Sequence, residues 1–310
     1  MEKGILINFP TNIGDTILSL PVLDRVKFNY PWDKITAVVS PRTKELISRS
    51  SFIDEIVSFD KSWTKREKRN FAFDLRGKYK VVVDLKNSFL PVVIGSKLRT
   101  PFIRFFPGKM HAKDRYMSLI RKIAPRKAER KGWFLDSDNK FKKWDGLNIP
   151  KSLFIACSSR SRIKQYPYRY LKRLVESLKG DFPLIVLGEE SDRSFYKDIL
   201  GLQGVKDFVG KTSLSDIFYL LNKYALGLIA VDSSILHIGS YLNVPVVGIF
   251  GPTDSVRFGP WSDKNLVLKN EKAVCAPCGE AVCRFNNECM DINPGEVISA
   301  LRKIIRHGKS

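Results

Sequence analysis

Residues Leu226–Asp254 read LGLIAVDSSILHIGSYLNVPVVGIFGPTD, and this stretch decides the fold class of the chain. It holds two continuous apolar runs of strand length, Leu226–Val231 and Val246–Phe250, with only residues 232–245 left to connect them. So short a connection between two apolar strands predicts a β-α-β unit in a parallel sheet. Its right-handed crossover brings the carboxyl ends of both strands to one edge of the sheet, where such sheets bind their ligands.

Polar residues follow both strands, at the edge where a ligand is expected. A helix that begins near Ser234 would direct unpaired backbone N–H groups and the positive end of its dipole toward this edge. Hydroxyl groups and the imidazole of His237, one turn into the helix, add further hydrogen-bond donors. The pattern predicts a diphosphate site; the alternative is an ordinary strand edge with a capped helix and a buried histidine. The candidate residues are Asp232, Ser233, Ser234, His237, Gly251 and Thr253.

The rest of the chain alternates apolar strands with helical segments in two sets. Each set predicts a doubly wound α/β domain, residues 1–145 and residues 146–310, and the polar linker at residues 136–150 separates them. Pro21 falls inside the first helical segment, so either the helix starts there or an irregular turn precedes it. The strands expected in the first half are Gly4–Phe9, Lys34–Ser40, Asp54–Phe59, Lys80–Leu85 and Pro101–Phe106.

Loops after the first strand of each half carry further candidate residues. Asp15 places a carboxylate at the start of a helix, where it either faces a ligand or caps the helix. Arg160 and Lys164 suit a phosphate group, or else they solvate the surface. Neither GxGxxG nor GxxxxGK[ST] occurs, so the sequence does not support dinucleotide or P-loop chemistry. The candidates are Asn12, Gly14 and Asp15 in the first half, and Ser159, Arg160 and Lys164 in the second.

Charge is concentrated in the first half of this 310-residue chain, whose formal net charge is +21. Residues 1–150 hold 31 Lys and Arg against 16 Asp and Glu, whereas residues 151–310 hold 22 against 16. The positive electrostatic potential of such a basic half attracts nucleic acid, an anionic membrane surface or an acidic lipid. Alternatively, the basic residues form a solvated face that keeps the protein soluble. No apolar run reaches the roughly 18 residues of a membrane span, and Glu2 argues against a signal peptide, so a cytoplasmic protein is expected.

Four of the five cysteines lie within residues 275–289. In a cytoplasmic chain such a group favours free thiols or a metal over disulfides. Its spacings can close a tetrahedral thiolate site for a structural zinc ion, and reduced structural thiols are the alternative. The four residues are Cys275, Cys278, Cys283 and Cys289.

Together these motifs resemble glycosyltransferase family 9, the lipopolysaccharide heptosyltransferases. The resemblance implies a GT-B fold, in which two facing Rossmann-like domains hold a nucleotide-sugar cleft between them. It further implies that Asp15 is the catalytic base, that Lys164 binds donor phosphate and that Asp192 lies near the donor ribose. The matching segments are Asn12-Ile-Gly-Asp15 with Leu20-Pro21, Tyr79–Ser88, Ser158-Ser159-Arg160 with Lys164-Gln-Tyr-Pro167, Gly210–Leu214, Asp232-Ser-x-x-x-His237 with Pro245–Thr253, and Cys275-Ala-Pro-Cys278.

The resemblance also implies an activity: inverting, metal-independent transfer of heptose from ADP-heptose to the lipid A–Kdo inner core. The first domain would then bind an acidic, phosphorylated glycolipid on the inner membrane, with Asn12, Gly14, Arg121 and Lys122 on the acceptor side. Phe102, Phe105 and Phe106, among Arg104 and Lys109, are expected to touch that membrane peripherally; alternatively they are buried aromatics of a strand. Ser234 replaces a glycine usual in the family, which leaves another nucleotide sugar open as donor. A basic nucleic-acid-binding protein without catalysis is the remoter alternative, although no nucleic-acid-binding module is recognised.

Overall fold

The computed structural model describes residues 4–102, 106, 109–127, 144 and 146–306. The chain divides into two compact units, residues 1–137 and 138–310. The predicted boundary lay at residues 145 and 146. Trp144 belongs instead with the second unit, because its indole N–H donates to the carboxylate of Asp216 at 2.7 Å and its ring lies 4.9 Å from that of Phe208.

The first unit is built on a parallel five-stranded sheet in the order β3-β2-β1-β4-β5. Strand β1 lies in the centre, where it pairs with β2 on one side and with β4 on the other. The strand order reverses between β1 and β4, so this is the switch point of the sheet. Its elements are β1 (Gly4–Asn8), α1 (Ile13–Asn29), β2 (Ile35–Val39), α2 (Pro41–Ser48), β3 (Glu55–Ser58), α3 (Lys65–Asp74), β4 (Tyr79–Asp84), α4 (Leu90–Ile94), β5 (Leu98–Arg99) and α5 (Ala112–Leu119).

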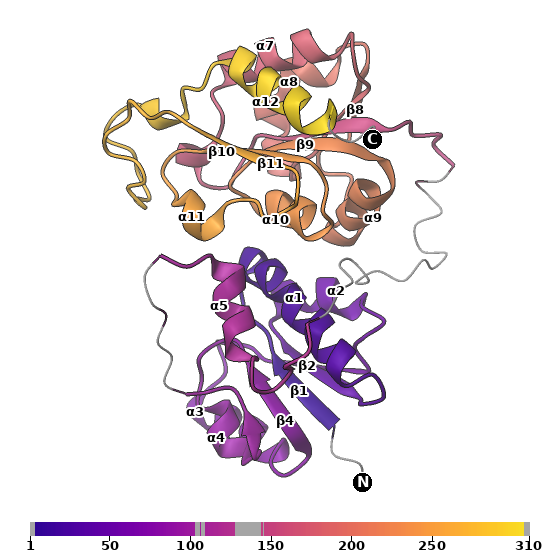
Figure 1. Cartoon of the computed structure of the whole chain (residues 1–310), viewed down its shortest axis with the longest axis vertical. Helices are drawn as coiled ribbons and strands as arrows, with labels where there is room; N and C mark the ends of the chain where they lie inside the picture. Colours follow the sequence, from indigo (N-terminus) through magenta and orange to yellow (C-terminus); the bar gives the residue numbers. More distant parts are fainter. Residues whose placement is uncertain (1–3, 103–105, 107–108, 128–143, 145, 307–310) are drawn as a thin grey trace. The chain divides into compact units, whose positions relative to one another are not determined.

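Helices cover both faces of this sheet. Helix α1 contacts α2 and α5 on one face, and α3 contacts α4 on the other (Figure 1). Beneath α3 and α4 lies an apolar cluster that includes Leu6, Val82 and Ile94, with Phe71 and Leu90 packed against it. The doubly wound arrangement predicted from the strand and helix alternation is confirmed.

Helix α1 runs without a break through Pro21. Neither of the predicted alternatives, a start at this proline or an irregular turn before it, is found. The hydroxyl of Ser19 donates to the carbonyl of Thr16 at 2.8 Å, and the residues on both sides of Pro21 are buried. Tertiary burial of the helix therefore outweighs the cost of the proline.

The last strand of the first sheet lies earlier than predicted. It is β5, which pairs with β4 and spans Leu98–Arg99 rather than Pro101–Phe106. Gly95 ends α4 in a left-handed conformation with φ +75°, which turns the chain back into the sheet early. Pairing then ends before Pro101, which has no N–H to donate. Residues 103–105 of the predicted strand lie outside the described residues.

The second unit has a parallel six-stranded sheet in the order β11-β10-β9-β6-β7-β8. Its switch point lies between β6 and β9, which pair directly. The β-α-β unit predicted from residues 226–254 is present as β9, α10 and β10, with β9 and β10 parallel. The elements are β6 (Ser152–Ala156), α7 (Tyr168–Leu178), β7 (Leu184–Val186), α8 (Arg193–Leu200), β8 (Val205–Asp207), α9 (Leu214–Tyr224), β9 (Ala225–Val231), α10 (Ser234–Tyr241), β10 (Val246–Phe250), α11 (Ser255–Phe258), β11 (Asn265–Lys269) and α12 (Pro294–Arg306).

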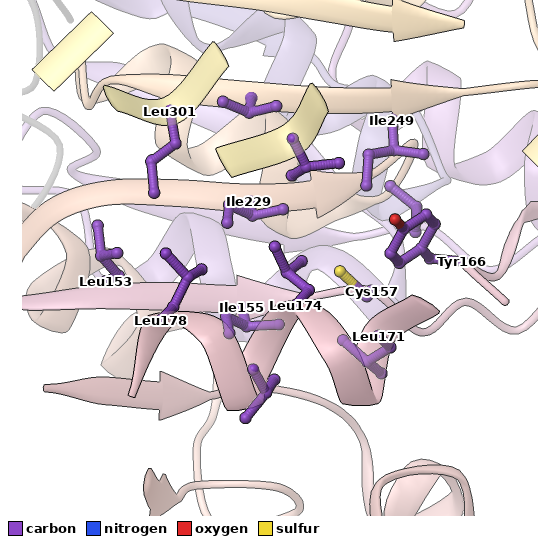
Figure 2. Close-up of a cluster of buried hydrophobic side chains, with 14 of the residues drawn as sticks. Leu153, Ile155, Cys157, Tyr166, Leu171, Leu174, Leu178, Ile229, Ile249 and Leu301 are labelled. Carbon is purple, nitrogen blue, oxygen red and sulfur yellow. The ribbon is translucent and has the colours of Figure 1, made fainter. Parts of the chain in front are cut away.

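A large apolar core lies between this sheet and helices α7, α8 and α12, while α9 and α10 cover the other face. Figure 2 shows Ile155 and Ile229 of the sheet meeting Leu174 of α7, with Leu301 of α12 above the strands. Cys157 is fully buried in this core, which raises the pKa of its thiol to about 12. Cys157 is therefore a structural residue with no accessible thiolate.

No helix among the described residues is both long enough and apolar enough to cross a membrane.

Candidate functional site

Two polar loops meet at the switch point of the second sheet, one after β6 and one after β9. The ammonium nitrogen of Lys164 lies 2.8 Å from Oδ2 of Asp232, and the side chain of Asp232 is only 9% exposed. The other carboxylate oxygen, Oδ1, lies 3.8 Å from Nε2 of His237. The structure thus brings together three of the predicted site residues, from two loops and one helix.

The start of α10 lies beside this group. Ser233 is the N-cap residue, and its hydroxyl accepts a long hydrogen bond of 3.5 Å from the N–H of Leu236. Ser234 is the first residue of the helix, and His237 is buried one turn later, stacked on Trp261 with 5.8 Å between ring centroids. The helix is thus capped and its histidine is buried, as the alternative interpretation expected, and the histidine also faces a carboxylate at the sheet edge. The diphosphate site stays a prediction.

The loop after β10 contributes Gly251 and Thr253. A Cβ at Gly251 would lie 2.6 Å from Sδ of Met290 and 2.7 Å from Sγ of Cys289. Gly251 is therefore required for packing against the segment that precedes α12, whatever its contact with a ligand. The hydroxyl of Thr253 is buried, and no described group forms a hydrogen bond with it. A buried hydroxyl without a protein partner beside the β9 loop is a candidate ligand contact.

The loops after β6 and β7 are joined by hydrogen bonds. The hydroxyl of Ser158 donates to Oδ2 of Asp192 at 2.9 Å, and the same oxygen accepts from the N–H of Glu189. Arg160 forms a bidentate ion pair with Glu189, with contacts of 2.6 to 3.0 Å, on the exposed side of the loop. The pair uses Nε and Nη2 of the guanidinium, and the phosphate-binding role of Arg160 stays a prediction.

Ser159 contributes to the shape of the same loop. Its hydroxyl accepts a hydrogen bond from the N–H of Ser161 at 3.3 Å, and its carbonyl accepts one from the side chain of Gln165 at 3.1 Å. Tyr166 follows as a fully buried residue whose hydroxyl donates to the carbonyl of Ile292 at 2.6 Å. These contacts fix the short segment that presents Lys164.

In the first unit, Asp15 lies in the first turn of α1, after the central strand β1. Its carboxylate does not cap the helix; among the described residues it accepts a hydrogen bond from the side-chain amide of Asn12 alone, at 3.2 Å. Asn12 is the N-cap residue by position, and Gly14 lies between the two in the first turn. Asp15 is half-buried, so it keeps acceptor capacity for a group outside the protein.

Arg121 and Lys122, predicted to face the acceptor, lie in the turn after α5 and are exposed. This turn docks onto α1, because the guanidinium of Arg25 donates to the carbonyls of Ala124 at 2.6 Å and Pro125 at 2.9 Å. Burial of Arg25 lowers the pKa of its guanidinium, and the nearby charge of Arg121 lowers it further. Among the described residues, no hydrogen bond joins Asp15 to Arg121 or Lys122, and their acceptor role stays a prediction.

The sequence analysis missed a buried cation at the switch point of the first sheet. Asp84 at the end of β4 is fully buried, and its Oδ1 accepts a hydrogen bond from the amide of Asn8 at 2.7 Å. Two residues later, the ammonium nitrogen of Lys86 is also buried, 4.7 Å from the centroid of the Phe59 ring, and no described residue accepts a hydrogen bond from it. Its place directly after the Tyr79–Asp84 strand was the signal that could have identified it.

Burial lowers the pKa of Lys86 to about 8, an effect that Asp84 opposes and Lys61 reinforces. Between this value and the unfolded value near 10.5, the unfolded chain binds more protons than the folded chain, so stability should rise with pH in this window. Below pH 8 the penalty of the buried charge is fully present. We expect Lys86→Met to stabilise the first unit by about 1–3 kcal/mol at pH 7, with the gain shrinking toward pH 10.

Urea unfolding of both proteins across this pH range would check the expectation. Lys78→Met, which removes an exposed lysine from the same unit, is the matched control and should leave stability nearly unchanged. A Lys86→Met protein that is less stable than the wild type at pH 7 would show that the ammonium group is fully satisfied in the fold.

The four clustered cysteines line one pocket of about 160 Å³ together with Pro252 and Asn287. However, the described residues contain no group of three His, Cys, Asp or Glu side chains placed to hold one metal ion. Burial is the main cause that raises the pKa of Cys289 to about 11, so its thiol is protonated near neutral pH. The arrangement fits reduced thiols, and the predicted zinc site stays a prediction.

Comparison with known proteins identifies the family. Glycosyltransferase family 9 (heptosyltransferase) matches residues 106–288. Lipooligosaccharide heptosyltransferase 2 of Campylobacter jejuni subsp. jejuni serotype O:6 is 25% identical, over 97% of this chain and 98% of its own length. The solved structure of Escherichia coli ADP-heptose lps heptosyltransferase II covers 99% of this chain and 100% of its own, with 19% identity and a TM-score of 0.74.

The structure of a family 9 glycosyl transferase from Veillonella parvula covers 99% of both chains, with 19% identity and a TM-score of 0.79. The GT-B class of glycosyltransferases is defined by two doubly wound parallel units. This chain has both units, and these two GT-B structures align with 99% of it. Within that class, the chain belongs to glycosyltransferase family 9, the heptosyltransferase family.

Proposed function

We propose that the protein transfers a heptosyl group from ADP-heptose to the inner core of a lipopolysaccharide, with inversion at the anomeric carbon. The observation that carries the proposal is the Lys164–Asp232–His237 group beside the start of α10. The names of its relatives support the sugar and the acceptor, because they include lipooligosaccharide heptosyltransferase 2 and lipopolysaccharide heptosyltransferase 3. The Escherichia coli structure named for ADP-heptose supports the donor nucleotide.

The transfer step needs a base on the acceptor side. An acceptor hydroxyl attacks the anomeric carbon as the bond from that carbon to the diphosphate oxygen breaks, and ADP leaves with the bonding electron pair. Asp15 takes the proton of the attacking hydroxyl, because its carboxylate keeps acceptor capacity beyond its hydrogen bond to Asn12. Attack from the face opposite the leaving group inverts the anomeric centre.

Charge that develops on the leaving diphosphate must also be met. Lys164 supplies a full positive charge, and the first N–H groups of α10 supply partial charges at fixed positions. Asp232 acts as a positioning residue, since its two oxygens face Lys164 and His237, at 2.8 Å and 3.8 Å respectively. This preorganised group would need no divalent ion to stabilise the leaving group, so we propose metal-independent transfer.

The acceptor we propose is an acidic, phosphorylated glycolipid at the cytoplasmic side of the inner membrane. The net charge of +15 on residues 1–150 supports such a partner.

Ser234 at the first position of α10 keeps a second candidate function open, a family 9 transferase with a different nucleotide sugar. Its side chain stands where a diphosphate would approach the helix. A non-catalytic nucleic-acid-binding protein is no longer a competing interpretation, because the chain belongs to a family of enzymes.

Calorimetric titration of ADP, UDP and GDP into the protein, with a chelator at physiological salt, tests the donor. We expect ADP to bind at least about tenfold more tightly than UDP or GDP, a difference of about 1.4 kcal/mol. Preference for UDP or GDP would overturn the ADP-heptose donor while keeping the enzyme class. Binding of no nucleotide, beside tight salt-dependent binding of nucleic acid, would overturn the proposed transfer itself.

A further inference from the structure

The first unit carries an exposed apolar surface that its own fold does not use. Phe89, Val92, Leu98 and Phe102, here called the α4 patch, are 68%, 47%, 37% and 44% exposed. The rings of Phe89 and Phe102 are in contact, with 4.6 Å between their centroids and a tilt of 32° between their planes. Val92 lies one helical turn after Phe89. The core below α4 is filled by Leu90 and Ile94, so the patch is a second, outward-facing apolar side of a short helix.

Basic side chains surround the α4 patch. Lys97 and Arg99 are exposed within it, and Arg99 is held against α4 by a long hydrogen bond of 3.5 Å to the carbonyl of Pro91. The neighbouring helix α3 contacts α4 and exposes Lys65, Arg66 and Arg69, none of which pairs with an acidic side chain among the described residues. Residues 61–102 hold eleven Lys and Arg against three Asp and Glu, a net charge of +8.

The two aromatic residues of the patch lie at the carboxyl edge of the sheet. Phe89 follows the carboxyl end of β4, and Phe102 follows that of β5. Helix α3 runs back across the sheet from the end of β3, so Lys65 and Arg66 at its start lie at this edge as well. Asp15 follows β1, the neighbour of β4, and therefore belongs to the same edge.

We propose that the α4 patch and the start of α3 form a membrane-docking surface that sets the carboxyl edge of the first unit against an anionic phospholipid bilayer. Aromatic rings exposed beside unpaired basic side chains fit the headgroup boundary of such a bilayer. A second copy of this chain fits poorly, because a symmetric contact would bring two surfaces of net charge +8 together. The inference rests on the proposed lipid-linked acceptor, whose sugar would then meet Asp15 at this edge.

This surface differs from the membrane contact expected from the sequence. Of the phenylalanines expected to touch the membrane, Phe102 is exposed and belongs to the patch. Phe106 is half-buried under the guanidinium of Arg115, 5.6 Å from its centroid, and Phe105 and Arg104 lie outside the described residues. The proposed surface therefore also includes Phe89 and Val92, which lie 13 and 10 residues before Phe102 in the chain.

Sedimentation with vesicles tests the proposal on the full chain. We expect binding to phosphatidylglycerol-containing vesicles but not to pure phosphatidylcholine, and a loss of about tenfold or more for Phe89→Ser/Phe102→Ser. Arg66→Glu/Arg69→Glu should cost at least as much, because each basic residue near an anionic surface strengthens binding roughly fivefold. Phe285→Ser, at a residue 56% exposed in the second unit, is the matched control and should bind like the wild type.

The outcomes separate this inference from the proposed function. Unchanged vesicle binding by Phe89→Ser/Phe102→Ser would overturn the docking surface, as would a wild type that ignores anionic vesicles. A dimeric wild type that becomes monomeric in the same variant would also overturn it, because the patch would then be a contact between copies. Nucleotide binding measured by calorimetry on the same variant should be unchanged, and its result bears on the proposed donor alone.

Discussion

Replacement of Asp15 by asparagine is expected to lower kcat by about 10²–10⁴-fold while leaving nucleotide affinity nearly unchanged, because a general base contributes this much to a transfer step. Asparagine keeps the shape of the side chain and a hydrogen bond with Asn12, but it cannot take the proton of the acceptor hydroxyl. Turnover with ADP-heptose and calorimetry with ADP would measure the two quantities separately.

The substitution also removes a negative charge from the first turn of α1, which should cost about 0.3–1 kcal/mol of stability. Asp114→Asn is the matched control, because Asp114 occupies the first turn of α5 in the same unit. It should show a similar loss of stability with near-normal turnover. If Asp15→Asn turns over at a rate close to the wild type, then Asp15 is a helix-end residue and another group takes the proton.

The fold could be predicted from the sequence because its determinants are local. Apolar runs such as Val246–Phe250 are buried on both faces of a parallel sheet, so their length and spacing alone indicate the strands. The predictions were wrong where tertiary structure outweighed the local conformational preference of the sequence. Helix α1 continues through Pro21 because it is buried, and the last strand of the first sheet is Leu98–Arg99 because the chain turns at Gly95 in a left-handed conformation.

The candidate site could be predicted only as far as strand order allows. Loops after adjacent strands must meet, and this places Lys164 beside Asp232 although 68 residues separate them. Strand order does not determine which side chains form ion pairs within those loops. Nothing near Arg160 in the sequence indicates that Glu189, from the loop after β7, occupies its guanidinium. The buried ammonium of Lys86 depends likewise on Phe59, which follows a different strand.

Replacement of Lys164 by methionine is expected to weaken nucleotide diphosphate binding by about 10–100-fold, since a charge-assisted hydrogen bond contributes about 1.5–3 kcal/mol. The same change leaves the carboxylate of Asp232, only 9% exposed, without its cation and next to the incoming phosphates. Calorimetry with ADP would measure the loss. Lys151→Met is the matched control: Lys151 precedes the same strand β6 at the opposite edge, where it donates to the carbonyl of Lys223, and its loss should leave affinity unchanged.

The double variant Lys164→Met/Asp232→Asn separates the two ways in which Lys164 acts. If Lys164 mainly neutralises Asp232, removal of the buried charge should restore both stability and ADP affinity, because an uncompensated buried carboxylate is costly. If Lys164 binds the diphosphate, the double variant should recover stability while ADP affinity stays low. We expect the second result, because the Lys164 side chain is 28% exposed and its ammonium can keep the contact with Asp232 while it donates to a phosphate oxygen. Recovery of affinity in the double variant would make Lys164 a structural partner of Asp232 and leave the start of α10 as the main phosphate contact.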